Sequence, residues 1–211
     1  LKLLNSPSRG LLVADEVGLG KTIEAGLIWT ELVARGDARR LLVVCPKSLR
    51  EKWRAELRTK FNVEAKLCDA GELLRDLKES GFGKKNFTYV ASLSGLKPNK
   101  GWQEELDPKR GSRDALAHYL KNANRDLFDL VIFDEAHHLR TRKTQNHALA
   151  ELLTEVASYK VFLSATPINL HTEDLRSLLN LIDEDTFGNE FLFPQLLSEN
   201  EPIVAAWEAA R

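Results

Sequence analysis

Methionine is absent from the 211 residues, even at position 1, and cysteine occurs only twice. Because a complete natural chain normally starts with methionine, we expect this sequence to be a segment of a longer protein or a processed product. Cys45 and Cys68 each lie in or beside an apolar segment, which predicts two buried thiols. Their spacing supports neither a disulfide framework nor a metal site. The protein is therefore expected to be intracellular.

Long apolar runs and an excess of one charge are also missing. No apolar run approaches the roughly 20 residues that span a bilayer, and the first ten residues lack the apolar core of a secretory signal. We therefore expect no membrane partner. The 30 basic and 31 acidic residues give a formal net charge of −1, so any nucleic-acid site must be local rather than a property of the whole chain.

What is present is an alternation of short apolar segments with longer segments of helical periodicity. The strand candidates are apolar at consecutive positions, which is typical of strands buried on both faces of a parallel sheet. They span residues 11–14, 40–45, 87–92, 128–134 and 160–165, with a weaker candidate at 63–68. The helix candidates span residues 21–35, 48–61, 71–80, 112–122, 144–157 and 172–182. This order predicts an α/β fold with an open, mostly parallel sheet flanked by helices.

The first helix candidate shows a clear apolar stripe. Four of its side chains recur at the spacing of one helix face, which predicts that they point into the core: Ile23, Leu27, Ile28 and Leu32.

The first chemical motif, GLGKT, lies between a predicted strand and this helix. Gly18 and Gly20 allow a tight turn whose N–H groups can surround a phosphate, and the helix start adds its positive dipole end. Lys21 can then pair with the outer phosphates, and the Thr22 hydroxyl can ligate Mg²⁺. The simpler alternative is a glycine turn before a solvated lysine. The usual P-loop pattern also wants a glycine where Asp15 stands.

The second motif, FDLVIFDEAHH, places two carboxylates at the carboxyl end of a buried strand, where ligands bind in open α/β sheets. Adjacent carboxylates are costly there unless a cation or a reaction uses them. We assign Asp134 to Mg²⁺, directly or through water, and Glu135 to the attacking water as general base. One alternative makes Asp134 a helix N-cap. Another makes a metal site with His137 and His138, although adjacent histidines do not have the spacing of hydrolase zinc motifs.

The third motif, LSATP at residues 163–167, also ends an apolar strand. Ser164 and Thr166 have short hydroxyls that could reach the DEAH turn and respond to the γ-phosphate. Alone, such a segment is usually an ordinary turn.

DEVGLGKT, DEAHH and SATP, in this order and spacing, resemble the Swi/Snf-type ATPases of helicase superfamily two, and the first is most similar to the bacterial branch. The likeness runs from residue 11 to about 188. It accounts for Asp15, because the family's first motif is DExGLGKT. It implies a RecA-like fold, with ATP and Mg²⁺ as cofactors. It also implies that Asp15, Glu16 and Leu19 join the nucleotide site, and that hydrolysis is coupled through His137, Ser164, Ala165 and Thr166.

Two further segments resemble motifs that contact the nucleic-acid backbone. PKSLREKWRAEL matches the family's motif Ia at Pro46, Lys47 and Ser48, and continues with its W..E pattern at Trp53 and Glu56. A helix starting at Ser48 could grip a phosphate, whereas the alternative for the nearby cations is an ordinary solvated helix start.

YVASL matches the next backbone-contacting motif at Ser92. The basic cluster after DEAHH begins at Arg140 and could line the duplex or be a solvated surface; the sequence leaves the two equal.

The resemblance implies that residues 1–188 form the N-terminal RecA-like ATP-binding lobe, with an exposed insertion at about 97–114. Residues 189–211 begin a helical extension, and a second RecA-like lobe with its arginine finger is expected outside this sequence. Without that arginine finger, the lobe should hydrolyse ATP roughly 10³–10⁵-fold more slowly than the complete motor.

The expected function is that of a double-stranded-DNA-dependent translocase that remodels or displaces bound proteins. Its partners would be duplex DNA, the second lobe and an unidentified protein client. A prokaryotic cytoplasm is favoured, with the nucleus as alternative.

Two other functions stay open: a strand-separating RNA or DNA helicase, and a non-catalytic scaffold on a motor fold. The DExGLGKT and VVCPKSL motifs disfavour the strand-separating helicase. The complete set of Lys21, Thr22, Asp134 and Glu135 disfavours the scaffold, because a scaffold has no need of this charge arrangement.

Overall fold

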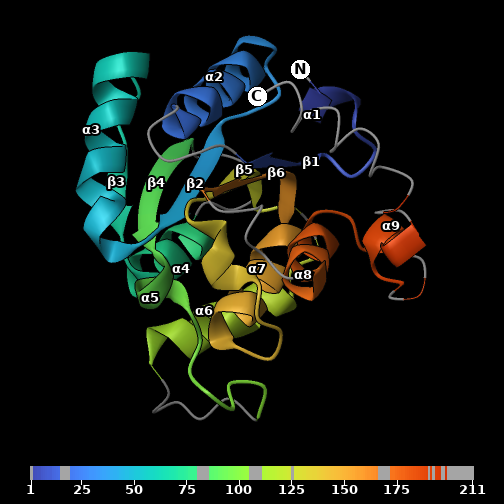
Figure 1. Cartoon of the computed structure of the whole chain (residues 1–211). Coiled ribbons are helices and arrows are strands. Elements are labelled where there is room, and N and C mark those ends of the chain that lie inside the picture. Colours follow the sequence, from blue (N-terminus) through green and yellow to red (C-terminus); the bar gives the residue numbers. More distant parts are fainter. Residues whose placement is uncertain are drawn as a thin grey trace.

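The structure, a computed structural model, describes residues 2–14, 20–79, 86–104, 111–124, 126–165 and 172–189, together with 191, 193–195 and 198. Within these ranges one sheet has six strands in the order β1-β6-β5-β2-β4-β3, and every neighbouring pair is parallel. The predicted parallel α/β sheet is thereby confirmed (Figure 1). The strands are β1 (Gly10–Ala14), β2 (Arg40–Cys45), β3 (Lys66–Cys68), β4 (Phe87–Ser92), β5 (Phe128–Phe133) and β6 (Ala157–Ser164).

The helices lie on both faces of this sheet. They are α1 (Lys2–Asn5), α2 (Lys21–Ala34), α3 (Arg50–Phe61), α4 (Ala70–Glu79), α5 (Leu93–Leu96), α6 (Ser112–Lys121), α7 (Gln145–Glu155), α8 (Thr172–Ile182) and α9 (Glu184–Phe187). Two 3-10 turns, η1 (Lys47–Leu49) and η2 (Ala136–Leu139), follow β2 and β5. Figure 1 shows α2 and α3 on one face, and α4, α6, α7 and α8 on the other.

Successive side chains of the central strands pack alternately into the two core layers, one on each face of the sheet. Along β2, Leu41, Val43 and Cys45 pack with α2 and α3, whereas Leu42 and Val44 pack with the opposite helices. Successive side chains of a strand point to opposite faces, so a strand covered on both sides is apolar at every position. This packing explains why the sequence shows continuous apolar runs instead of alternation.

The predicted core stripe of α2 is wrong for two of its four residues. Ile23 and Leu27 are 42% and 57% exposed. The helix instead approaches α3 through a small residue: a Cβ at Gly26 would lie 2.2 Å from the Phe61 ring. Small side chains are easily missed by a search for large apolar ones, yet they set which face is buried. The buried residues of α2 are Ala25, Gly26, Ile28, Trp29 and Leu32.

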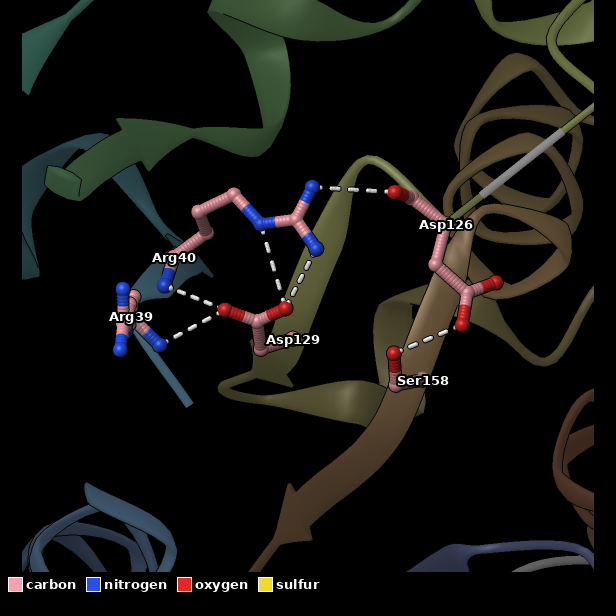
Figure 2. Close-up of polar contacts among 5 residues, drawn as sticks. All are labelled: Arg39, Arg40, Asp126, Asp129 and Ser158. Atoms are coloured by element: carbon pink, nitrogen blue, oxygen red, sulfur yellow. Dashed lines mark hydrogen bonds and ion pairs between the residues drawn. The ribbon is translucent and has the colours of Figure 1, made fainter. Parts of the chain in front are cut away.

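A buried carboxylate ties together the amino ends of the central strands (Figure 2). Asp129, on β5, is 8% exposed and accepts the backbone N–H groups of Arg39 and Arg40 at 2.7 and 2.8 Å. Its other oxygen accepts from the Arg40 guanidinium, at 3.1 Å from Nε. The guanidinium also donates to the Asp126 carbonyl at 3.0 Å, and the Ser158 hydroxyl donates to the Asp126 carboxylate at 2.7 Å. These bonds fix β2, β5 and β6 at one edge.

The predicted insertion at 97–114 is anchored where the structure describes it. Trp102 is 5% exposed, with the Lys121 ammonium 5.7 Å from its ring centroid. Asp114 is 2% exposed and accepts the Asn99 backbone N–H at 2.7 Å, while Arg113 donates to the Asn99 side-chain oxygen at 2.6 Å. The sequence predicted an exposed insertion here. The described part of this segment is instead packed against the domain.

The remaining composition-based expectations concern thiols and membrane spans. Cys45 and Cys68 are free and buried, as predicted, and burial raises the pKa of each thiol to about 12. Within the described ranges, no helix combines the length and apolar character needed to cross a membrane.

Candidate nucleotide site

Three chain segments meet at the carboxyl edge of the sheet. Ala14, the last residue of β1, pairs with Ser164, the last residue of β6. On the other side of β6, Phe162 pairs with Phe133, the last residue of β5. The carboxyl ends of β1, β6 and β5 therefore lie side by side at this edge, where open α/β sheets bind their ligands.

The start of α2 has the conformation expected of a phosphate-binding turn. Gly20 has φ 96° and ψ 20°, a left-handed conformation that glycine adopts without steric cost. Its carbonyl accepts the N–H groups of Ile23 and Glu24 at 2.7 and 3.1 Å, which closes the first helical turn. Lys21 and Thr22 are half-buried in that turn. The first N–H groups of a helix have no intrahelical acceptor, so they can bind an anion.

The rest of the predicted nucleotide-binding segment lies outside the described residues: Asp15, Glu16, Gly18 and Leu19.

Asp134 is held in place by three hydrogen bonds. Its backbone N–H donates to the Val44 carbonyl at 2.8 Å, which extends the pairing of β5 with β2. Its Oδ1 accepts the Glu135 N–H at 2.9 Å, and its Oδ2 accepts the indole N–H of Trp53 at 2.7 Å. A carboxylate has about four lone-pair sites, so each oxygen keeps acceptor capacity beyond these bonds. A half-buried, oriented carboxylate of this kind fits Mg²⁺, which prefers oxygen ligands.

Glu135 lies in a strained backbone conformation. Its φ of 54° and ψ of 48° fall in the left-handed region, which costs a residue with a Cβ roughly 1–2 kcal/mol. Its carbonyl accepts the His138 N–H at 3.0 Å and so starts η2. Strain of this kind occurs at functional sites when the surrounding structure enforces it.

The first histidine of the DEAH turn contacts the predicted general base. Glu135 Oε2 lies 3.1 Å from His137 Nδ1, although the angles at that nitrogen do not make a hydrogen bond. Burial lowers the pKa of His137, and the neighbouring His138 lowers it further, while Glu135 opposes both. The imidazole is therefore neutral near pH 7, and the contact is polar without being a full ion pair.

A buried histidine that the sequence did not single out supports this turn. His147, on α7, is 3% exposed, and its Nδ1 lies 2.7 Å from the carbonyl of Leu139, the last residue of η2. Its Nε2 lies 3.3 Å from Glu151 Oε1. Asn146 adds a bond from its side-chain amide to the His138 carbonyl at 3.2 Å. Helix α7 therefore fixes the turn that carries Glu135.

The predicted coupling residues lie partly within the described structure. Ser164 is fully buried at the end of β6, and Ala165, the next residue, is half-buried. Thr166 lies outside the described residues.

The predicted nucleic-acid contacts separate into two groups. Lys47 and Ser48 are exposed in η1, and Pro46 precedes them half-buried, so this turn presents polar groups at the carboxyl edge. Ser92, by contrast, is 4% exposed, and its hydroxyl accepts the Gly95 N–H at 3.1 Å as the N-cap of α5. The exposed residues are thus better placed for a phosphate than Ser92 is.

The fifth predicted contact already has a partner. Arg140 Nε lies 3.4 Å from Asp174 Oδ2 on α8. This ion pair links the end of the DEAH turn to the helix that follows SATP.

The alternative metal site at the two histidines receives no support from the described residues. Among them no group of three or more His, Cys, Asp or Glu side chains is arranged to hold a metal ion. The carboxylate and hydroxyl donors of Asp134 and Thr22 suit Mg²⁺ bound together with phosphates, because Mg²⁺ keeps several waters and needs few protein ligands.

Comparison with known proteins places these motifs in a family. The sequence profile of the SNF2-related domain matches residues 1–206. The RNA polymerase-associated protein RapA of Vibrio atlanticus (strain LGP32) is 32% identical over 199 residues, and that of Stutzerimonas stutzeri (strain A1501) is 33% identical over 199 residues. Each alignment covers 93% of this chain but 19% of the relative, so the chain spans about a fifth of the length of these relatives.

Solved structures confirm the fold class. The SWI2/SNF2 ATPase core of Sulfolobus solfataricus in complex with dsDNA matches with a TM-score of 0.60 at 18% identity, covering 88% of this chain and 34% of that chain. The SWI2/SNF2 ATPase core domain of Sulfolobus solfataricus also matches with a TM-score of 0.60, at 20% identity. At these identities the likeness concerns the fold alone.

Proposed function

The chain belongs to the SNF2-related domain family, and on that premise we propose that it is the first motor lobe of a duplex-DNA-dependent ATPase of the Swi/Snf type. In this proposal residues 1–188 form the ATP-binding lobe, and residues 189–211 begin a helical extension. A second RecA-like lobe of the same protein completes the catalytic cleft. The motor moves along DNA and remodels or displaces bound proteins, in a prokaryotic cytoplasm.

One observation supports the proposal: the ends of β1 and β5, which precede the glycine turn of α2 and the Asp134–Glu135 pair in the chain, flank the end of β6 at one sheet edge. A phosphate bound at the helix start would then lie near a metal-binding carboxylate and a general base. A scaffold without catalysis has no use for a strained glutamate and an oriented aspartate at the same edge.

Each residue has a defined part in hydrolysis. The first N–H groups of α2 and the Lys21 ammonium bind the phosphates. Thr22 and Asp134 hold Mg²⁺, which when bound neutralises the charge that develops on the phosphate oxygens. Glu135 orients the attacking water and accepts its proton at the carboxylate. The neutral His137 beside Glu135 is placed to respond to that change of charge.

The proposed DNA contact is the exposed turn after β2. Lys47 and Ser48 stand at the same sheet edge as the nucleotide residues, and α3 continues directly from this turn. The Sulfolobus solfataricus relative of the same fold is described in complex with dsDNA. The bacterial relatives are named for association with RNA polymerase, which makes a polymerase complex the first protein client to test.

The decisive experiment measures phosphate release by the intact protein that carries this lobe. It compares no nucleic acid, duplex DNA, single-stranded DNA and RNA, for the wild type and Glu135→Gln. Stimulation chiefly by duplex DNA, with release lost in the variant, supports the translocase. Stimulation by RNA or single strands favours a strand-separating helicase. If the protein hydrolyses no ATP under any condition, both motor functions are excluded and the non-catalytic scaffold is favoured.

A matched pair of lysines tests the DNA contact. Each phosphate contact contributes a slope of roughly 0.9 to the fall of log K with log salt for duplex DNA. Lys47→Ala should therefore reduce the magnitude of that slope by roughly 0.9, the contribution of one phosphate contact. Lys52→Ala is the control, because Lys52 is exposed on α3 and lies 4.0 Å from Glu56. Equal slopes for both variants would remove Lys47 from the DNA interface.

A further inference from the structure

The contact between Trp53 and Asp134 joins residues 81 positions apart in the sequence. Trp53 lies on α3, is 2% exposed and belongs to the core layer between α3 and the sheet. Its indole N–H is a donor that cannot accept, so burying it is costly unless an acceptor is present. The acceptor here is a carboxylate oxygen at 2.7 Å. Hydrogen bonds to a charged acceptor are about twice as strong as neutral ones.

A second buried tryptophan shows that packing alone does not require this bond. Trp29, on α2, is 4% exposed and belongs to the same core layer. Its indole N–H donates to no residue in the part of the chain that the structure describes. The Trp29 nitrogen is not among the buried polar atoms that lack a partner, so it keeps access to water, whereas the indole of Trp53 donates to the Asp134 carboxylate.

We propose that Trp53 is a positioning residue, whose buried indole N–H holds the Asp134 carboxylate in the orientation that binds Mg²⁺. This inference rests on the proposed function, because it requires Asp134 to bind the metal. Asp134 Oδ2 is fixed by the indole, and Oδ1 is fixed by the Glu135 N–H at 2.9 Å. With one donor on each oxygen, the plane of the carboxylate is set before the metal arrives.

Loss of the indole donor would free one side of this arrangement. In Trp53→Phe, a ring of similar shape still fills the core, but Oδ2 would face an apolar wall without a donor. The carboxylate would then gain by rotating toward water and away from its metal-binding orientation. Removing such an outer partner of a metal ligand typically lowers metal affinity by roughly 10–100-fold.

The first test measures binding of a fluorescent ATP analogue by the chain as Mg²⁺ is varied. We expect Trp53→Phe to raise the Mg²⁺ concentration needed for half-maximal enhancement of binding by roughly tenfold or more. Binding without Mg²⁺ should be unchanged. Trp29→Phe is the matched control and should leave the Mg²⁺ requirement at the wild-type value. Phosphate release by the intact protein should show the same shift in Mg²⁺ requirement.

The second test observes the hydrogen bond and needs no Trp53 variant that folds. The chain has four tryptophans and so four indole N–H resonances in a ¹⁵N correlation spectrum. We expect Asp134→Asn to move one of them strongly upfield in ¹H, because the charged acceptor is gone. Trp53→Phe should delete that same resonance, whereas Trp29→Phe should delete another.

The outcomes separate this inference from the function on which it rests. If Asp134→Asn leaves the Mg²⁺ requirement unchanged, Asp134 is not the metal ligand, and both the site assignment and the role of Trp53 fail. If Asp134→Asn abolishes the Mg²⁺ response while Trp53→Phe behaves like Trp29→Phe, only the positioning role fails. An indole spectrum insensitive to Asp134→Asn would overturn it independently.

Discussion

Asp129 and Asp134 stand near opposite ends of strand β5, and their surroundings differ. Asp129, at the amino end, is 8% exposed and accepts two backbone N–H groups together with the guanidinium of Arg40 (Figure 2). Asp134, at the carboxyl end, is half-buried and accepts one backbone N–H and one indole N–H. The first carboxylate has its charge paired within the protein, whereas no cation of the described residues pairs with the second.

This difference separates stability from function along one strand. The Asp129 oxygens at the amino end are fully used as acceptors. Removing them would leave buried N–H donors and the buried charge of Arg40 without a partner. The carboxylate at the carboxyl end keeps acceptor capacity, which the proposed Mg²⁺ site would use, next to Glu135 in its left-handed conformation. Groups held in this way commonly lower stability in exchange for activity.

The largest effect is expected at Glu135, through Glu135→Gly compared with Glu135→Gln. Both variants lose the general base, so DNA-stimulated phosphate release should fall by roughly 10²–10⁴-fold. Only glycine also relieves the left-handed conformation, so Glu135→Gly should raise the free energy of unfolding by about 1 kcal/mol. Chemical denaturation and phosphate release measure the two effects. Equal stability of the two variants would show that the backbone stores no strain there.

At the other end of β5, Asp129→Asn should damage stability and spare the site. Breaking a buried charge pair costs about 3–5 kcal/mol, and because the Arg40 side chain is still 20% exposed, we expect a loss near the lower figure. Nucleotide binding below the melting temperature should be unchanged. Asp126→Asn is the control: its exposed carboxylate accepts only the Ser158 hydroxyl among its hydrogen bonds in the described structure, so we expect a loss within about 0.5 kcal/mol. A similar loss for both variants would contradict this account of the amino end.

Much of the fold could be predicted because the sheet is covered on both faces. Continuous apolar runs gave β2 and β4 residue for residue, and α8 likewise kept its predicted bounds. The start of β6 was missed, because its first residues are half-buried and follow α7 without a break in pattern. The face of α2 was misjudged, because the small residue Gly26, and not a large one, makes the closest approach.

The site was predictable only as far as it follows from local pattern. The order strand, glycine turn, helix and the order strand, DEAH could both be seen in the sequence, and the strands that precede the two motifs, β1 and β5, both end beside β6. The contacts that orient these groups join distant positions: Trp53 with Asp134, and His147 with Leu139. Nothing in the local pattern of either partner indicates the other, so only the folded chain shows them.

A smaller effect distinguishes structural from ligand-binding hydroxyls at the carboxyl edge. Ser92→Ala removes the N-cap of α5, which should lower the free energy of unfolding by about 1 kcal/mol. Because this hydroxyl is buried and already accepts the Gly95 N–H, we expect duplex-DNA affinity to stay unchanged. Ser48→Ala, at an exposed position, should show the reverse pattern. A loss of DNA affinity in Ser92→Ala without a loss of stability would return Ser92 to the DNA interface.

The smallest effect depends on pH and concerns the contacts of His147, which joins the Leu139 carbonyl of the DEAH turn to Glu151. The hydrogen bond from His147 lowers the pKa of Glu151 below its usual 4.5, against the opposing effect of burial. The folded state therefore binds this proton less readily than the unfolded state, so the stabilisation is complete above pH 4.5 and disappears as the pH falls through the folded pKa. Since the Glu151 side chain is 55% exposed, Glu151→Gln should cost only a few tenths of a kcal/mol at neutral pH. Denaturation curves at decreasing pH should show the wild type and Glu151→Gln converging; Glu155→Gln, at an exposed position of the same helix, is the control substitution. A gap that persists in acid would mean that Glu151 stabilises α7 by packing and not by its bond to the histidine that holds the turn.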